Sequence, residues 1–322
     1  MRSIRMLAGL AALVAAAVAP VAAQTKFPEK PVRLVLGSAA GSGPDIISRT
    51  LADRLYGAWG QRIVVDPRPG VAGVLSADIV LRSPPDGYTW MMLTSQLLVA
   101  TNVYDSNVKF DLAKDFASIS LLGTTSFTLV VHPDLPAKSI PELIELAKKQ
   151  QLRYGSSGTG ASEHLSGVLL TTLSKTDMLH VPYKGVAEAI AATMGREVNF
   201  TYGVVPAVVP HVQSGRLRAL GVTGPKRSFM LPDVPAIGEF LPGYQTLAWY
   251  SVVAPRGTPV AILEKASADI QKAVKDPQFG EQLKGVGLET VGSTRGELDA
   301  FRADQTRRVR EVVKLAGVNS KQ

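Results

Sequence analysis

The sequence contains no cysteine, which excludes disulfides and a lipid anchor of the lipoprotein type. Histidine is scarce as well, with four residues at positions 132, 164, 180 and 211, and their scattered spacing does not match that of a zinc site. Such histidines are more typical of hydrogen-bonded structural positions than of metal ligands. We therefore expect neither a bound metal nor another cofactor.

Motifs that assemble a catalytic centre are also missing. The segment Gly155-Ser156-Ser157-Gly158 is not a nucleophile elbow, and no segment has the spacing of a P-loop. The segment Gly41-Ser42-Gly43 lacks the third glycine and the acidic residue of a dinucleotide site. One enzymatic alternative stays open, a serine hydrolase that would combine a serine of the first segment with His164 or His180.

The N-terminus has the pattern of a secretory signal peptide spanning residues 1–23. Arg2 and Arg5 precede an apolar stretch over residues 6–18, and small residues end the segment at Ala23. The alternative is a membrane anchor, but the apolar stretch is shorter than the roughly 20 residues needed to cross a bilayer, and Pro20 interrupts its end. We predict an exported protein that is cleaved near Ala23.

The formal net charge of +8 falls to +6 once Arg2 and Arg5 are removed with the leader. Such an excess either steers small anions towards a cleft or only solvates the surface. A basic cluster lies near the C-terminus, opposite apolar residues on the same predicted helix. We interpret it as a solvated helix face and not a nucleic-acid site, because no aromatic residues are interleaved with it. The cluster comprises Arg302, Arg307, Arg308, Arg310 and Lys314.

Short β-rich segments alternate with helical ones along the chain, which is typical of an α/β fold with a mostly parallel sheet. The predicted strands are 32–36, 62–66, 88–93, 119–122, 128–131, 152–155, 198–202 and 217–223. The predicted helices are 46–56, 72–81, 140–149, 162–173, 186–194 and 207–213, with two more after Thr258-Pro259 and after Thr294. Ser139 with Glu142, and Thr294 with Glu297, form capping-box patterns. The length favours two lobes.

A glycine-rich turn opens into a helix twice, once in each half of the chain. The first turn spans Gly37 to Asp45 and the second spans Tyr154 to Ser162. Each should direct unpaired backbone N–H groups and the positive end of a helix dipole at one point. Two such points would form a clamp for a small anion, although glycines in such turns also serve simple connections.

Asp45 has two interpretations. In the first, it complements the dipole of the helix that follows; in the second, it accepts a hydrogen bond from an ammonium or a bridging water of the ligand. The chemistry of the residue favours the first interpretation slightly.

The first turn resembles the glycine turn ending in aspartate that opens the receptors of tripartite tricarboxylate transporters, also called Bug or TctC-like receptors. Further matches to this family follow in order, and together they extend over residues 26–318. They are Asp66 to Gly70, Ser83 to Thr89, Lys114 to Phe116, Gly158 to Leu165, His180 to Gly185, Ser214 to Leu220, Leu231 to Pro235 and Ala254 to Pro259.

The resemblance implies a two-lobed periplasmic binding protein of the Venus-flytrap, type II-like shape. Two hinge-crossing strands are expected near residues 123–127 and 246–252. Residues 25–123 and 250–322 would then form lobe one, and residues 124–249 lobe two. The implied function is the capture of a small organic carboxylate for the membrane permease subunits of a tripartite transporter, without an enzymatic step. A sensor subunit of a periplasmic signalling system is the alternative, and we expect a monomer that binds no nucleic acid.

Departures from the family pattern bear on the ligand. Ala161 stands where a threonine is common, and Tyr202-Gly203-Val204 stands where phenylalanine, aspartate and asparagine are common. An ammonium group would lose an acceptor there, so we expect an organic acid without an amine, with an apolar body packing on Tyr202 or Trp249. The first turn carries Ser38 and Ser42 where apolar and glycine residues are usual.

The candidate ligand-binding residues come from both turns and from the loops expected beside them. They are Ser38, Ala39, Ala40, Gly41, Ser42, Asp45, Ser157, Gly158, Thr159, Gly160, Ala161, Ser162, His164, Tyr183, Tyr202, Gly203 and Trp249.

Overall fold

The computed structural model describes residues 27–103 and 108–317, and the predicted signal peptide lies outside these residues. The strands are β1 (Val32–Leu36), β2 (Ile63–Pro67), β3 (Thr89–Thr94), β4 (Phe116–Val131), β5 (Leu152–Ser156), β6 (Met178–Pro182), β7 (Phe200–Val204), β8 (Arg218–Val222), β9 (Leu247–Pro255) and β10 (Glu289–Thr290). The α-helices are α1 (Gly43–Trp59), α2 (Val74–Leu81), α3 (Ser95–Val103), α4 (Leu112–Asp115), α5 (Ile140–Lys149), α6 (Ser162–Ser174), α7 (Val186–Met194), α8 (Val205–Gln213), α9 (Val260–Lys275), α10 (Pro277–Leu283) and α11 (Arg295–Leu315). The short 3₁₀ helices among the described residues are η1 (Val71–Gly73), η3 (Ile237–Glu239) and η4 (Lys284–Val286).

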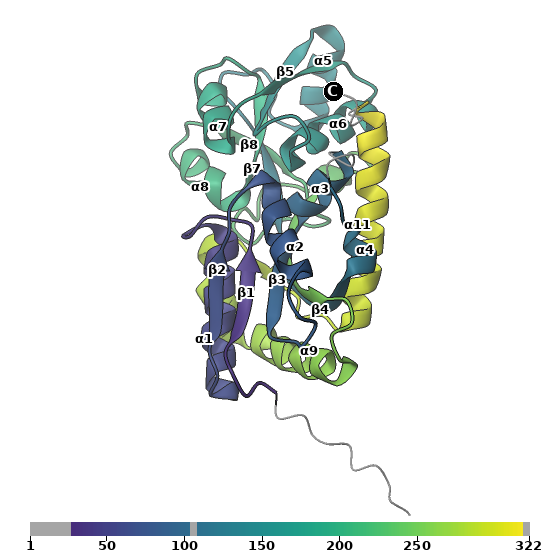
Figure 1. Cartoon of the computed structure of the whole chain (residues 1–322). Helices are drawn as coiled ribbons and strands as arrows, with labels where there is room; N and C mark the ends of the chain where they lie inside the picture. The colour runs from purple at the N-terminus through teal and green to yellow at the C-terminus, as the bar shows by residue number, and fades with distance from the viewer. Residues whose placement is uncertain (1–26, 104–107, 318–322) are drawn as a thin grey trace, which may run out of the picture.

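All these strands belong to one sheet with the order β2-β1-β3-β9-β4-β7-β5-β6, and β8 and β10 also pair with β4. The strands β1, β2 and β3 are parallel to one another, as are β5, β6 and β7. β4 and β9 run antiparallel to their neighbours. The predicted α/β fold with two lobes is confirmed, and Figure 1 shows β1 to β3 in one lobe and β5, β7 and β8 in the other.

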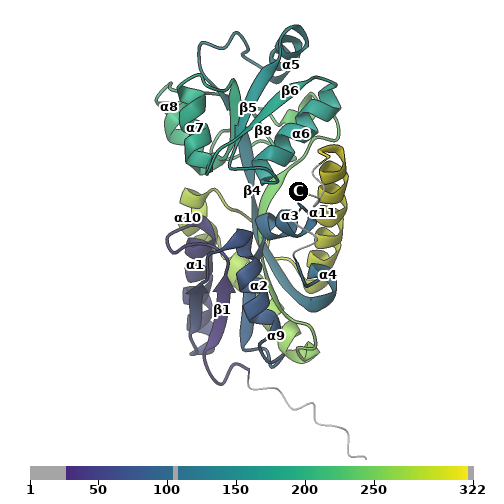
Figure 2. The ribbon, with the colours of Figure 1, turned by 45° about the horizontal axis from the view of Figure 1, so that its top comes forward.

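β4 and β9 connect the lobes, as Figure 2 shows for β4. β4 pairs with β9 over Phe116 to Ser126, and then with β7 and β8 from Phe127 onwards. The sequence predicted two separate strands here, whereas the structure has one strand of 16 residues. A side chain at Gly123 would come within 2.4 Å of the carbonyl oxygen of Glu289 in β10, so this glycine permits a close strand approach and marks no turn. The lobe boundaries themselves stay a prediction.

Each lobe has its own apolar core. In lobe one, β1, β3 and α1 enclose fully buried side chains that include Trp90 and Leu51. In lobe two, β4, β5 and β7 enclose Leu129, Tyr154 and Phe200. Among the described helices, none is both long enough and apolar enough to cross a membrane.

A smaller apolar cluster joins the two lobes through helices. Val99 and Val103 of α3 and Val312 of α11 pack against Leu165 of α6. In both views α11 runs along one side of the molecule from lobe one towards α6. This cluster packs α3 against α6, the helix that follows the second turn.

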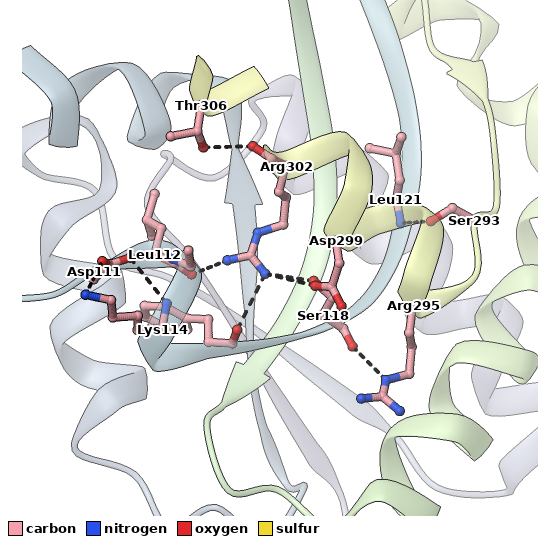
Figure 3. A network of polar contacts seen from close by, with 12 residues as sticks. Asp111, Leu112, Lys114, Ser118, Leu121, Ser293, Arg295, Asp299, Arg302 and Thr306 are labelled. Carbon is pink, nitrogen blue, oxygen red and sulfur yellow. Dashed lines mark hydrogen bonds and ion pairs between the residues drawn. The ribbon is translucent and has the colours of Figure 1, made fainter. Parts of the chain in front are cut away.

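The basic cluster on α11 is not uniformly solvated, which corrects the interpretation made from the sequence. Arg302 is 8% exposed, and its guanidinium donates hydrogen bonds to Ser118 Oγ (2.7 Å) and to the carbonyl oxygens of Leu112 and Phe116. Figure 3 shows Arg302 reaching from α11 to the segments that precede and begin β4. Burial lowers the pKa of Arg302, and the charges of Asp299 and Asp111 act in the opposite direction. Arg302 therefore attaches α11 to the first half of β4.

The predicted helix caps are present with one difference. Thr294 and Glu297 form a complete capping box at α11. Ser139 accepts the N–H of Glu142 at α5, but the Glu142 carboxylate accepts the N–H of Lys138 and not that of Ser139. The cap of α5 is therefore half of a capping box.

Candidate functional site

The two glycine turns extend from the carboxyl ends of β1 and β5, and α3 spans the space between them. Gly37 and Ser38 of the first turn line a small polar cavity with Gln96 at the start of α3. At the other end of α3, its last residue Val103 lies beside Gly160 of the second turn. A side chain added at Gly160 would come within 2.7 Å of Val103. With a helical rise of 1.5 Å per residue, the two contacts lie about 10 Å apart along α3. The structure therefore brings both turns to opposite ends of one short helix.

In the first turn, Asp45 is 3% exposed and holds the backbone in place. Its Oδ2 accepts the N–H of Gly41 (2.9 Å) and the Nε–H of Arg49 (2.9 Å). Burial by itself would raise the pKa of Asp45, but the hydrogen bonds from Arg49 and Gly41 outweigh it and the pKa is lowered. Oδ1 is buried and has no hydrogen bond from the residues that the structure describes. Asp45 is thus an ionised carboxylate with one oxygen committed to the turn.

The second turn satisfies several of its own backbone donors. The N–H of Gly158 donates to Ser156 Oγ (3.1 Å), the N–H of Gly160 to His164 Nδ1 (3.0 Å), and the N–H of Ala161 to the carbonyl oxygen of Gly158 (3.2 Å). We expected these N–H groups to point towards a ligand, and in this conformation they point inwards. The sequence pattern identified the turn but did not reveal that Ser156 and His164 supply internal acceptors.

Two neighbouring histidines, His164 and His180, make hydrogen bonds to the second turn. The rings of His164 and His180 are stacked with centroids 3.9 Å apart, and Tyr154 packs against both. Burial lowers the pKa of His164 to about 4, and burial together with His164 lowers the pKa of His180 to about 4. Both rings are therefore neutral at neutral pH, which allows His164 Nδ1 to accept the Gly160 N–H.

Acidification is expected to destabilise the protein through these histidines. Their folded-state pKa values of about 4 lie below the ordinary value of 6.5, so the unfolded chain binds more protons between these two pH values. The free energy of unfolding should fall as the pH decreases from 6.5 to about 4. Thermal melts across this range measure the effect. His164→Asn keeps a side-chain acceptor but cannot be protonated, and an unchanged pH dependence in this variant would contradict the assignment.

The structure brings a serine and a histidine into contact, which bears on the hydrolase alternative. Ser156 Oγ lies 2.6 Å from His180 Nε2. Ser156 is fully buried, however, and its hydroxyl also bonds to the carbonyl oxygen and the N–H of Gly158. A nucleophile has to reach its substrate, and this hydroxyl is enclosed by its own turn. The contact therefore supports the turn and gives no reason to propose a hydrolase.

Tyr202 and Gly203 lie inside lobe two and do not form an exposed wall. Tyr202 is fully buried, and its hydroxyl contacts Tyr244 and donates to the carbonyl oxygen of Ser166 (3.4 Å). A side chain at Gly203 would come within 2.6 Å of Val208 in α8, so tight packing explains why no acidic residue stands there. The expected apolar contact between Tyr202 and a ligand is therefore absent from this conformation.

Trp249 is 1% exposed, but it borders a cavity that the predicted residue Ser162 also lines. The cavity measures about 50 Å³ and lies between α3, α6, α11 and the start of β9. Leu98, Leu165 and Val309 contribute much of its apolar lining. Of the two side chains expected to pack on the apolar body of a ligand, Tyr202 and Trp249, Trp249 is thus the one that borders an open space.

Sequence reasoning missed Glu163, the second residue of α6. Its Oε2 accepts a hydrogen bond from the hydroxyl of the predicted residue Ser157 (2.8 Å). An acidic residue in the first turn of a helix is a recognisable signal, but it is most often explained by the helix dipole alone. The described residues contain no group of three or more His, Cys, Asp and Glu side chains arranged to hold a metal ion.

Comparison with known proteins identifies the family. Residues 47–318 match the model of the tripartite tricarboxylate transporter family receptor. The chain is 33% identical over 308 residues to a UPF0065 protein encoded between tcbD and tcbE in Pseudomonas sp. strain P51. The aligned region covers 94% of this chain and 91% of that protein.

Two solved structures of Rhodopseudomonas palustris proteins are similar to most of the chain. Rpa4515, solved with adipate, has 31% identity and a TM-score of 0.78 over 90% of this chain and 98% of its own. MatC, solved with bound malate, has 26% identity and a TM-score of 0.73 over 89% of this chain and 100% of its own. The chain therefore belongs to the family of tripartite tricarboxylate transporter receptors.

Proposed function

We propose that this protein is an exported periplasmic receptor that binds a small organic carboxylate between its two glycine turns. The observation that carries the proposal is the arrangement of α1 and α6, which follow the turns and both begin without a side-chain cap. Side chains cap α4, α5, α10 and α11, and among the helices that begin without such a cap, α1 and α6 are the two that follow the glycine turns. An uncapped helix N-terminus leaves backbone donors and a positive dipole end for an anion.

The ligand class follows from the site and its relatives. Adipate and malate, the molecules present in the two similar structures, are both dicarboxylates without an amine. In this chain the residue before α6 is Ala161, which has no hydroxyl, whereas the nearby Ser157 hydroxyl already donates to a carboxylate, that of Glu163. The apolar cavity beside Trp249 suits the hydrocarbon part of such an acid. We infer a dicarboxylate or a monocarboxylate with an apolar body.

The biological role that fits this site is delivery and not turnover. Closure of the lobes about β4 and β9 would remove water from the carboxylate and strengthen its hydrogen bonds. The closed form would then be the state that the permease subunits of a tripartite transporter recognise, so that the ligand shifts an open-to-closed equilibrium. The signal peptide of residues 1–23 would direct the chain to the periplasm as a monomer without enzymatic activity.

A carboxylic acid should stabilise the protein, whereas its amide should not. The panel comprises malate, adipate, succinate and 3-phenylpropionate with their amides. At 100 times its dissociation constant, a binding acid should add about 2.7 kcal/mol to the free energy of unfolding, which raises the Tm by roughly 5–8 °C for a chain of this size. Differential scanning fluorimetry measures the shift. Equal stabilisation by an acid and its amide would contradict a carboxylate site.

A further inference from the structure

Glu163 accepts hydrogen bonds from two donors near the start of α6, the Ser157 hydroxyl and its own N–H, which the proposed site would otherwise offer to a ligand. It is half-buried, and its Oε2 accepts the Ser157 hydroxyl at 2.8 Å. Burial raises the pKa of Glu163, and the hydrogen bonds from its own N–H and from Ser157 only partly offset this. A carboxylate of the protein thus stands where the proposed function, on which this inference rests, places the carboxylate of the ligand.

No cation compensates Glu163 among residues 27–103 and 108–317, where neither lysine, arginine nor histidine forms an ion pair with it. The elements packed against α6 are α3, α11, β5, β6 and β7. α3 contains no ionisable residue, and Arg308 of α11, which shares the Trp249 cavity with Ser162, is paired with Asp304 at 2.7 Å.

Apart from Arg153, the other ionisable groups that face Glu163 from β5, β6, β7 and α6 are neutral at neutral pH. The strands β5, β6 and β7 contribute Tyr154, His180 and Tyr202, and α6 itself contributes His164. Burial raises the pKa of both tyrosines and lowers that of both histidines. Arg153 also lies in β5 but is exposed. The neighbourhood of Glu163 therefore provides hydrogen bonds without an opposing charge.

Two carboxylates that share one donor, with no cation beside them, cannot both stay ionised, because the like charges at close range raise the pKa of one of them. We propose that Glu163 determines specificity by coupling the binding of an organic acid to the uptake of one proton. The proton comes from solvent and binds a carboxylate oxygen of Glu163. The neutral carboxyl group then donates a hydrogen bond to the ionised carboxylate of the ligand, and the Ser157 hydroxyl becomes available as a second donor.

The coupling has a defined direction. If one proton is taken up on binding, the affinity for an acid rises as the pH falls, by up to tenfold per pH unit. His164 and His180 do not contribute between about pH 6 and about pH 8, since their pKa values are about 4. The acids of the panel are almost fully ionised above about pH 7, so the comparison is made between about pH 7 and about pH 8. The pH dependence in this window therefore reports on Glu163.

Isothermal titration calorimetry of the full mature chain tests the proposal, with the tightest-binding of malate, adipate, succinate and 3-phenylpropionate as the probe. Titrations in buffers of different ionisation enthalpy count the protons taken up. We expect about one proton for the unmodified protein at the upper end of this pH range. Glu163→Gln, which is neutral and can donate a hydrogen bond, should take up none, should lose the pH dependence and should bind more tightly than the unmodified protein at about pH 8.

Glu142→Gln is the matched control. Like Glu163, Glu142 is an acidic residue in the first turn of a helix, here α5, and its carboxylate accepts a hydrogen bond, from the N–H of Lys138 in the preceding loop. It should keep the proton uptake and the pH dependence. If no acid of the panel binds the unmodified protein, the proposed function fails and this inference fails with it. If acids bind without proton uptake, or with the same pH dependence in Glu163→Gln, this inference alone is overturned. The proton count of the unmodified protein decides the matter even if Glu163→Gln does not fold.

Discussion

Replacing Arg302 by methionine is expected to lower the free energy of unfolding by about 3 kcal/mol, because buried acceptors left without a donor cost roughly 1–3 kcal/mol each. Arg302 donates to Ser118 Oγ and to the carbonyl oxygens of Leu112 and Phe116, and methionine keeps the apolar stem while removing every donor. The Tm should fall by roughly 6–9 °C. Thermal and chemical unfolding, both followed by circular dichroism, measure the change.

Arg307→Met provides the control on the same helix. The Arg307 side chain is 57% exposed and pairs with Asp304 and Glu311 on the surface. Exposed ion pairs contribute little to stability, so the Tm of this variant should stay unchanged. If Arg302→Met had the same Tm as the unmodified protein, the prediction would be wrong, and the free-energy cost of burying the guanidinium would equal the gain from its hydrogen bonds.

Much of the fold could be predicted from local patterns in the sequence. β1, α5 and α7 begin and end at the predicted residues, because alternating or helical apolar periodicity coincides there with clear turn or capping signals. α3 was missed for the opposite reason. Leu97, Leu98, Val99 and Ala100 are all buried, so α3 shows no polar face and its sequence has no helical period. Its role between the two turns is consequently a property of the tertiary structure alone.

The candidate site could be predicted only in part. Both turns were found because glycine, small residues and a following helix leave a local signature. The acceptors inside the second turn are local, but Ser156 Oγ also contacts His180, which lies 24 residues away in β6, a strand that was not predicted. The orientation of Tyr202 depends on the pairing of β7 with β4, which directs the ring towards Tyr244 in the core.

Gly160→Val is expected to abolish the binding of carboxylic acids while leaving a folded protein. Gly160 has a φ of +78°, a left-handed conformation that a β-branched residue strongly disfavours. A side chain there would also meet Val103 Cγ1 at 2.7 Å. The turn would have to move away from α3, and the N–H of Gly160 would lose its bond to His164 Nδ1. We expect a loss of affinity greater than about 100-fold, which corresponds to roughly 2.7 kcal/mol.

Two further variants separate the contributions to this effect. Gly185→Val is the matched control, since Gly185 precedes α7 in the same lobe, has an extended backbone and has open space where a Cβ would lie. It should bind acids normally. Val103→Ala removes the clash but not the left-handed strain, so its combination with Gly160→Val should recover only part of the affinity. Calorimetry with the tightest-binding acid of the panel measures each variant. Normal binding by Gly160→Val would show that the second turn only connects β5 to α6 and that the ligand is held elsewhere.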